Sequence, residues 1–217
     1  MKRGRFIALE GGEGVGKSTQ SRLLADALRA RGFDVVVTRE PGGTPGAETI
    51  RGLLLDTAGE GWGRRAEALL FAAARADHVE RLIRPALAAG QWVICDRYLD
   101  SSRAYQGGGG GLPDADLLAI HRVGSEGLLP DLTVLIEVPP SETAARLARR
   151  DAGATDRISG RDAAYHARVA EAFARLAEAE AGRFARIDGA GPPEVTHAAI
   201  LAALAPFLDA TQEANGA

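Results

Sequence analysis

A glycine-rich stretch near the N-terminus restricts the possible folds of this chain more than any other feature. The residues from Gly11 to Ser18 read GGEGVGKS, which fits the pattern G-x-x-x-x-G-K-[ST] of a phosphate-binding loop. The apolar run 6–9 precedes this loop, and apolar residues recur at helical spacing in 23–28 behind it. Because a strand, a loop and a helix in this order are the context that the pattern requires, the sequence predicts a site for a nucleoside triphosphate.

The chemistry of such a loop assigns roles to its residues. Glycines let several backbone N–H groups point into one concavity, and the helix N-terminus adds a partial positive charge. Lys17 is expected to reach the β- and γ-phosphate oxygens, and the Ser18 hydroxyl to bind Mg²⁺. Only Lys2 and Lys17 among the 26 basic residues are lysines. The loop therefore has a lysine, whose compact ammonium fits a tight backbone loop, in a chain that otherwise uses arginine almost everywhere. The residues expected to bind ATP are Gly11, Gly12, Glu13, Gly14, Val15, Gly16, Lys17, Ser18 and Thr19.

Short apolar runs alternate with helical segments along the whole chain. The runs are Phe6–Leu9, Val35–Thr38, Gln91–Cys95, Leu132–Val138 and Phe184–Ile187. The helical segments with the clearest spacing are 65–89, 161–181 and 194–208, and the polar tail 209–217 is expected to fray. This alternation predicts an α/β fold with a five-stranded parallel sheet flanked by helices on both faces. The length of 217 residues suits a single domain.

Composition excludes several classes of partner. A net charge of −3 gives no general attraction to nucleic acid or to an anionic membrane. The single cysteine, Cys95, excludes an internal disulfide, and its place in an apolar run indicates a buried small hydrophobe. The N-terminus shows no long apolar segment that could serve as a signal or a membrane span. We therefore expect a cytoplasmic protein without nucleic-acid or membrane partners.

Two segments depart from the regular pattern. Residues 107–111 are five consecutive glycines, too flexible for the interior of an element, and predict either a long surface loop or a backbone that moves or approaches a ligand. Residues 146–161 place five arginines around a run of small residues between two helices. We interpret this second segment as a mobile lid that closes over bound nucleotide.

Three further groups of residues narrow the chemistry. Asp96 and Arg97 end the third apolar run, where parallel sheets place ligands; the carboxylate suits Mg²⁺, while Arg97 faces either an anion or a structural ion-pair partner. The turn 39–44 ends the second run at the same edge. Phe71 and Arg75 are four residues apart on a helix, so they can stack on a base and bond its edge, or else belong to a core-facing helix with a solvated arginine.

Together these motifs resemble the bacterial thymidylate kinases, a family of P-loop nucleoside monophosphate kinases. The matching segments are 11–18, 39–44, 50–55, 71–75, 96–98, 102–107, 130–133 and 187–188. The resemblance implies a three-layer P-loop kinase fold, a homodimer, and ATP-dependent phosphorylation of dTMP to dTDP for dTTP synthesis. Residues 188–191 would run alongside the adenine ring of ATP.

The resemblance also implies an acceptor site. Its residues are Glu13, Glu40, Pro41, Arg51, Phe71, Arg75, Arg97, Ser102, Tyr105 and Gln106. Phe71 would stack on thymine and Arg75 would contact its edge. Arg97 and Arg51 would hold the acceptor phosphate, and Tyr105 would crowd the sugar 2′ position.

The expected catalytic groups are cations. An acidic Glu13 together with an arginine-rich 146–157 segment marks, in this family, the form whose lid supplies the catalytic arginine. The catalytic set is therefore Lys17, Arg97 and the two lid candidates Arg149 and Arg150, and the metal ligands are Ser18 and Asp96. Because the acceptor phosphate has a second pKa near 6, it is already an anionic nucleophile and needs no general base. The four histidines, His78, His121, His166 and His197, are far apart in the sequence, which agrees with a site that needs no general base.

Two alternatives remain to be weighed against this hypothesis. The segment 56–59 reads DTAG, like the D-x-x-G segment of a GTP-dependent switch, but it follows a helical rather than a β-rich lead. Such switches also read guanine with N-K-x-D, and the only asparagine here is Asn215. A kinase for another nucleoside monophosphate on the same fold is the second alternative, and turnover with different monophosphates distinguishes it.

Overall fold

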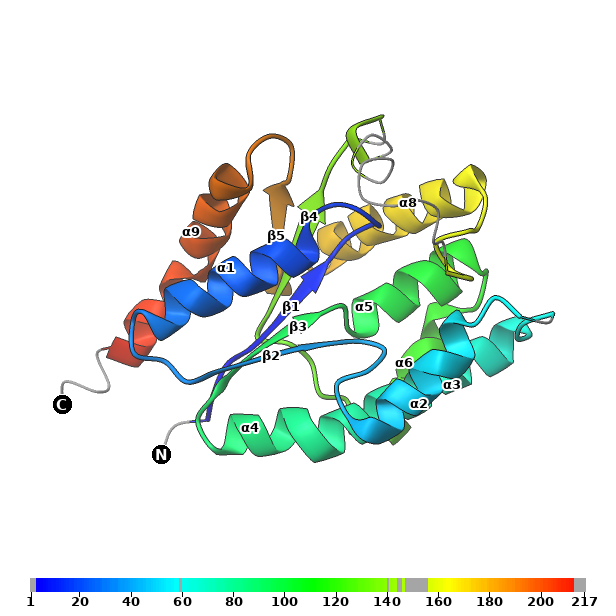
Figure 1. Ribbon diagram of the computed structural model, residues 1–217, viewed down its shortest axis with the longest axis horizontal. Helices are drawn as coiled ribbons and strands as arrows, with labels where there is room; N and C mark the ends of the chain where they lie inside the picture. The colour runs from blue at the N-terminus through cyan, green and yellow to red at the C-terminus, as the bar shows by residue number, and fades with distance from the viewer. Residues whose placement is uncertain (1–2, 59, 140, 144–145, 147–155, 213–217) are drawn as a thin grey trace.

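The computed structural model describes residues 3–58, 60–139, 141–143, 146 and 156–212 (Figure 1). Five parallel strands form one sheet in the order β2-β3-β1-β4-β5. Their bounds are β1 Phe6–Glu10, β2 Val35–Arg39, β3 Trp92–Asp96, β4 Leu132–Glu137 and β5 Phe184–Asp188. Each predicted strand is confirmed to within one residue at either end.

Helices connect the strands on both faces of the sheet. Those with α-helical geometry are α1 Lys17–Arg29, α2 Pro45–Leu55, α3 Arg64–His78, α4 Arg84–Ala88, α5 Leu99–Ser102, α6 Asp114–Ser125, α8 Ala163–Ala179 and α9 Pro193–Gln212. The described residues also contain two π-helical turns, η1 Val79–Ile83 and η2 Arg103–Gly109, and a 3₁₀ turn, η3 Ala181–Arg183. Helix α2 leads directly to Asp56, so the helical lead that argues against a GTP switch is confirmed.

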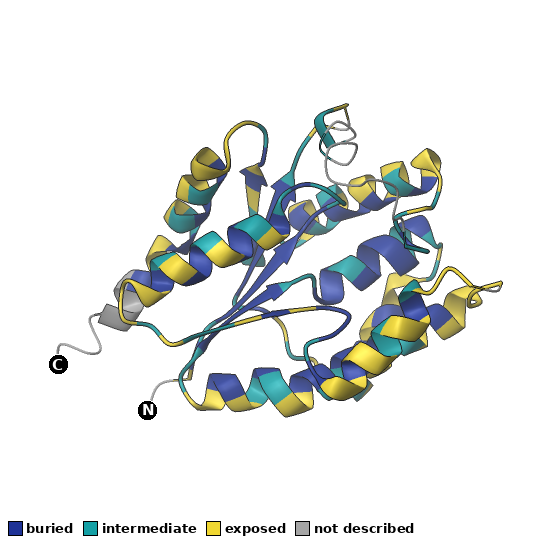
Figure 2. Cartoon of the chain, in the orientation of Figure 1, coloured by how far each residue is buried: buried dark blue, intermediate teal, exposed yellow. Residues whose placement is uncertain are grey.

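The sheet is the middle of three layers. Helices α1 and α9 cover one face, where their apolar side chains meet strand residues such as Ile7 and Ile94. The helical segment 64–88 and helix α8 cover the other face and pack on residues such as Phe6 and Leu135. The central strands β1, β3 and β4 are buried almost throughout, while the edge strands β2 and β5 are only partly buried (Figure 2). This burial of both faces explains the continuous apolar runs in the sequence.

The strand order determines where a ligand can bind. β1 lies between β3 and β4, with Leu9 beside Asp96 and Glu10 beside Leu135. The chain leaves β1 toward one edge of the sheet, returns to β3, and then crosses over β1 to β4. Loops that leave neighbouring strands on opposite sides open a crevice at the carboxyl ends of the strands. The phosphate-binding loop after β1 and Arg97 after β3 therefore lie side by side.

The glycine run does not form a long surface loop, so that prediction for 107–111 is wrong, while movement of this backbone or its approach to a ligand stays a prediction. Its first three residues close the π-helical turn η2, which packs closely against α8. A Cβ at Gly108 would lie 2.3 Å from Cβ of Ala172, and one at Gly109 would lie 2.5 Å from Cε2 of Tyr165. The glycines are thus required by the close approach of two helical segments, a tertiary demand that composition alone does not reveal.

Three smaller expectations can be compared with the structure. Helix α9 continues to Gln212, beyond Asp209 where the sequence predicted a frayed tail. Cys95 is fully buried, as predicted, and burial raises the pKa of its thiol well above the ordinary value. Within the part of the chain that the structure describes, no helix has the length and hydrophobicity needed to cross a membrane.

Candidate active site

A crevice of about 1000 Å³ opens at the carboxyl ends of the strands. The predicted site residues that line it are Glu13, Gly14, Val15, Gly16, Lys17, Ser18, Thr19, Glu40, Pro41, Arg51, Phe71, Arg75, Asp96, Arg97, Ser102, Tyr105 and Gln106. Gly11 and Gly12 are not part of this lining but contribute carbonyl groups to Lys17 beneath it. Arg149 and Arg150 lie outside the described residues, as does most of the expected lid.

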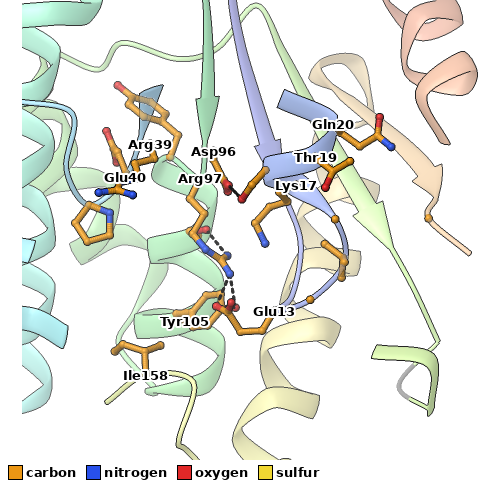
Figure 3. Close-up of a pocket in the computed structure, with 18 of the residues that line it drawn as sticks. Glu13, Lys17, Thr19, Gln20, Arg39, Glu40, Asp96, Arg97, Tyr105 and Ile158 are labelled. Carbon is orange, nitrogen blue, oxygen red and sulfur yellow. Dashed lines mark hydrogen bonds and ion pairs between the residues drawn. The ribbon is translucent and has the colours of Figure 1, made fainter. Parts of the chain in front are cut away.

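The phosphate-binding loop forms one end of the crevice. Gly16 ends the loop in the left-handed region, at φ 101°, and no side chain caps the first turn of α1. Lys17 begins that helix (Figure 3), and its Nζ donates to the carbonyl oxygens of Gly11 at 3.1 Å and Gly12 at 2.6 Å. Burial, aided by the nearby charge of Arg97, lowers the pKa of Lys17 to about 8. An uncapped helix start beside a buried ammonium suits an anion.

A pair of oxygen ligands lies next to this loop. The Ser18 hydroxyl donates to Oδ2 of Asp96 at 2.7 Å, so the start of α1 and the end of β3 present their oxygens together. A hydroxyl and a carboxylate are hard ligands of the kind that Mg²⁺ prefers. The two residues predicted as metal ligands are thus brought together in a form that fits the ion.

Arg97 lies between the two ends of the crevice. Its backbone is left-handed, at φ 70°, a conformation that is uncommon for a non-glycine residue and clusters at functional sites. The guanidinium donates to Glu13 Oε1 at 2.5 Å, to the Tyr105 hydroxyl at 3.1 Å, to the Gly11 carbonyl at 2.9 Å and to Ser101 Oγ at 3.1 Å. The ion-pair alternative is therefore present, with Glu13 as the partner, and the pair faces the crevice (Figure 3).

Glu10 supports Arg97 from behind, a role that sequence reasoning missed. Its Oε2 accepts the Ser101 hydroxyl at 2.6 Å, while Oε1 accepts the N–H groups of Tyr98 at 2.8 Å and Ser101 at 3.1 Å. The Ser101 oxygen is then left to accept from Arg97. A fully buried carboxylate at the end of an apolar strand was the available signal, because such a group needs partners.

Glu10→Gln should flatten the pH dependence of stability. Burial first, and then the charge of Asp100, raise the pKa of Glu10 from its ordinary 4.5 to about 7. The folded chain therefore binds this proton more tightly than the unfolded chain, so this group's stabilisation is full below pH 4.5 and is lost as pH rises through 7. The melting temperature of the natural protein should fall more between about pH 5 and about pH 8 than that of the variant. Equal shifts in thermal scans would contradict this.

Arg75 forms the other end of the crevice. It is buried, so the alternative of a solvated arginine is wrong. Its Nε donates to Oε2 of Glu40 at 2.7 Å, and its Nη2 donates to Ser102 Oγ at 2.8 Å and to the Tyr98 carbonyl at 3.3 Å. Phe71, one turn earlier on α3, also lines the crevice and is only partly buried. An apolar ring and a fixed guanidinium on one helix face suit a nucleobase.

Two further predicted residues line the crevice but are already held by protein groups. Arg51 Nη1 donates to the Pro41 carbonyl at 2.7 Å, and Gln106 Nε2 donates to Glu67 Oε1 at 2.9 Å. Glu67 was missed by sequence reasoning, as was His78. Their positions offered a signal, because Glu67, Phe71, Arg75 and His78 are spaced by four, four and three residues and so share one face of α3.

The segment with the expected lid is described only at its edges. Arg146 donates to the Gly189 carbonyl at 2.8 Å and, more distantly, to the Val15 carbonyl at 3.4 Å. Arg157 donates to the Asp56 and Ala58 carbonyls, each at 2.6 Å. These contacts hold the edges of the segment on opposite sides of the crevice. Of the predicted adenine strip 188–191, Gly189 and Gly191 line the crevice.

Known proteins resemble this chain over nearly its whole length. The family model for thymidylate kinase matches residues 9–200. A thymidylate kinase of Rhizorhabdus wittichii is 57% identical over 205 residues, which cover 94% of this chain and 99% of the relative. One of Bradyrhizobium sp. is 50% identical over 196 residues, which cover 89% and 87%.

A solved structure agrees with these matches. The crystal structure of thymidylate kinase from Ehrlichia chaffeensis superposes with a TM-score of 0.75 at 30% identity, and the match covers 93% of this chain and 99% of that one. The family model, the two relatives and the shared fold agree, and the chain belongs to the thymidylate kinase family.

Proposed function

We propose that the crevice is the active site in which this thymidylate kinase transfers the γ-phosphoryl group of ATP to dTMP, giving dTDP. The observation that supports this proposal is that one crevice joins a loop suited to phosphate with side chains suited to a nucleobase. The uncapped loop with Lys17 forms one end, Phe71 and Arg75 form the other, and Arg97 lies between them. Two nucleotides placed end to end would bring their phosphates together at Arg97.

The chemistry that these residues must perform is charge neutralisation. The acceptor phosphate is itself the nucleophile, so the obstacle is repulsion between a triphosphate and a phosphate. Lys17 would bind the β- and γ-oxygens, and Arg97 would hold the acceptor phosphate and offset its charge. Positioning and electrostatic stabilisation of the moving phosphoryl group then supply the catalysis.

Mg²⁺ would be held by the Ser18 hydroxyl and the Asp96 carboxylate. When bound, the ion neutralises charge on the β- and γ-phosphates. The support is the 2.7 Å contact between the two side chains, which places both oxygens at the loop.

Glu13 would exchange partners during the reaction cycle. In the structure its carboxylate accepts from Arg97 and lies 3.4 Å from the Tyr105 hydroxyl. An incoming phosphate is a stronger partner for a guanidinium, because it offers two oxygens and more charge. We propose that the phosphate replaces Glu13 on Arg97 and that Glu13 then faces the sugar of the acceptor.

Phe71→Ala should raise the KM for dTMP by roughly tenfold or more, because base–aromatic stacking contributes about 1–3 kcal/mol per base. The KM for ATP should stay within about twofold, since Phe71 is on α3 at the acceptor end. A coupled ADP-release assay with dTMP, dUMP, dCMP and UMP measures both the effect and the substrate preference.

The same assay contains its control. Leu129→Ala removes an exposed apolar side chain from the loop before β4, away from the crevice, and should leave both KM values unchanged. Preference of the natural protein for a monophosphate other than dTMP would overturn the proposed function, while equal changes in the two KM values would remove Phe71 from the acceptor site.

We also propose that the protein is a homodimer and that α3 and α6 form its interface. These helices pack together and expose Leu69, Leu118 and Val123, the last of which is 83% exposed. Exposed apolar side chains on neighbouring helices favour a protein partner. A cytoplasmic location is proposed because the one thiol, Cys95, is buried and free.

A further inference from the structure

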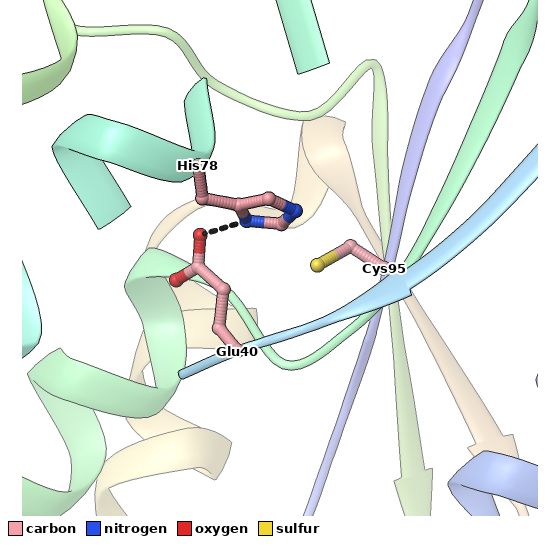
Figure 4. Close-up of side chains that lie close together, drawn as sticks. All are labelled: Glu40, His78 and Cys95. Carbon is pink, nitrogen blue, oxygen red and sulfur yellow. Dashed lines mark hydrogen bonds and ion pairs between the residues drawn. The ribbon is translucent and has the colours of Figure 1, made fainter. Parts of the chain in front are cut away.

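A chain of buried hydrogen bonds runs from the core to Arg75. Behind Glu40 lies the fully buried ring of His78, whose Nδ1 is 3.0 Å from Oε1 of Glu40 (Figure 4). The other ring nitrogen, Nε2, is 2.7 Å from the Thr38 hydroxyl. On its far side, Glu40 accepts from Arg75 at 2.7 Å. Thr38, His78, Glu40 and Arg75 thus form one continuous series of contacts.

The hydrogen bonds assign the donors in this series. A carboxylate has only acceptor oxygens, so Nδ1 of His78 donates to Glu40. The Nε2 atom bonds to the Thr38 hydroxyl, which can either donate or accept. Burial acts to raise the pKa of Glu40, but Arg75 and His78 outweigh it and hold the pKa below its ordinary value. Glu40 is therefore ionised and needs both partners.

The neighbouring thiol does not turn this cluster into a metal site. Glu40, His78 and Cys95 offer ligand atoms that lie within 4.8 Å of one another. Each of them already has another partner, however, and the Cys95 thiol donates to the Arg97 carbonyl at 3.0 Å. The guanidinium of Arg75 on Glu40 also disfavours a second cation. The cluster therefore acts through hydrogen bonds.

The loop after β2 is shaped around His78. Gly43 has φ +91°, and a Cβ there would lie 2.4 Å from Oγ1 of Thr38 and 2.5 Å from Nε2 of His78. The same loop carries Glu40 and the Pro41 carbonyl that Arg51 contacts. Glycine at this position lets the backbone close over the imidazole, which excludes water from the contact.

We propose that His78 is a positioning residue for dTMP binding: it fixes the Glu40 carboxylate, which in turn fixes the Arg75 guanidinium for the base. This inference rests on the proposed place of Arg75 in the acceptor site. His78 itself lies behind Glu40 and touches no ligand. Without its ring, Glu40 loses one of two partners, so Arg75 must be ordered by the nucleotide at the expense of affinity.

The test compares replacements that keep different parts of the imidazole. His78→Phe keeps a ring and removes both nitrogens. His78→Asn places an amide N–H where Nδ1 stood, and His78→Gln reaches only toward Thr38. Calorimetric titration with dTMP alone should show the Kd raised roughly tenfold in the Phe and Gln variants, which corresponds to about 1.4 kcal/mol. The Asn variant should recover most of the affinity, and the KM for ATP should remain unchanged in all three.

Two controls separate positioning from other causes. Val79→Ala loosens the core at the next residue of the same helical segment and should leave the Kd for dTMP unchanged. Arg75→Ala tests whether Arg75 belongs to the acceptor site. If this variant does not weaken dTMP binding, the proposed acceptor site is wrong, and the positioning role of His78 is not what has failed. If Arg75→Ala weakens binding while His78→Phe does not, the inference is overturned. Should His78→Phe fail to fold, equal affinities of the Asn and Gln variants would overturn it instead.

Discussion

Arg97→Ala should lower kcat for dTDP formation by about 10³-fold or more, the effect of removing an arginine that neutralises a transferring phosphoryl group. The guanidinium lies between the phosphate-binding loop and η2, and its carboxylate partner Glu13 faces the same crevice. Alanine removes this fixed fork of donors, so the repulsion between the two substrates is less well opposed. Initial rates of ADP release at saturating ATP and dTMP measure the loss.

The control for this variant is a surface arginine. Arg65 is 80% exposed on α3 and only approaches Asp116, at 3.9 Å, so Arg65→Ala should change kcat by less than about twofold. Arg97→Lys keeps the charge but not the bidentate fork, and should recover only part of the rate. A kcat for Arg97→Ala within tenfold of the natural protein would show that Arg97 does not act on the transferred group.

Lys17→Met should lower kcat by roughly 10²–10³-fold, because a preorganised donor to the β- and γ-phosphates is lost. In the natural protein, kcat/KM for ATP should also fall as pH rises through about 8. Burial and the charge of Arg97 lower the pKa of Lys17 to about this value. Bound phosphates favour the protonated amine, so kcat itself should stay level over the same range. Rates at limiting and saturating ATP across this pH range separate the two effects.

Lys17→Arg provides the matched variant. It keeps the positive charge, but the larger guanidinium does not fit where Nζ contacts the carbonyl groups of Gly11 and Gly12. We expect it to be nearly as impaired as Lys17→Met. Full activity with arginine would mean that charge alone is required at this position and that the tight loop geometry has no catalytic role.

The sequence was sufficient for features that depend on local pattern. The strands follow from apolar runs, and the loop, Ser18 and Asp96 follow from a motif and from the rule that parallel strands place ligands at their carboxyl ends. Arg97 was also predicted, because a charge at the end of a buried strand needs an anion or a partner.

Features that depend on tertiary neighbours were not predictable in this way. Glu10 bonds to residues 88 and 91 positions away, and His78 to residues 38 and 40 positions away, so a local pattern can point to these residues but not to their partners. The glycine run was misread for the same reason: its composition indicates freedom, but contact with α8 determines its structure. Long-range packing overrode local propensity in each case.

The contact between Glu13 and Arg97 has a thermodynamic consequence. Glu13 belongs to the loop that would receive ATP, and Arg97 belongs to the wall that would receive dTMP. If ATP changes the affinity for dTMP by separating this pair, then dTMP must change the affinity for ATP by the same factor, because linkage between two sites is reciprocal. A single carboxylate thus makes the two affinities interdependent, without any movement of the sheet.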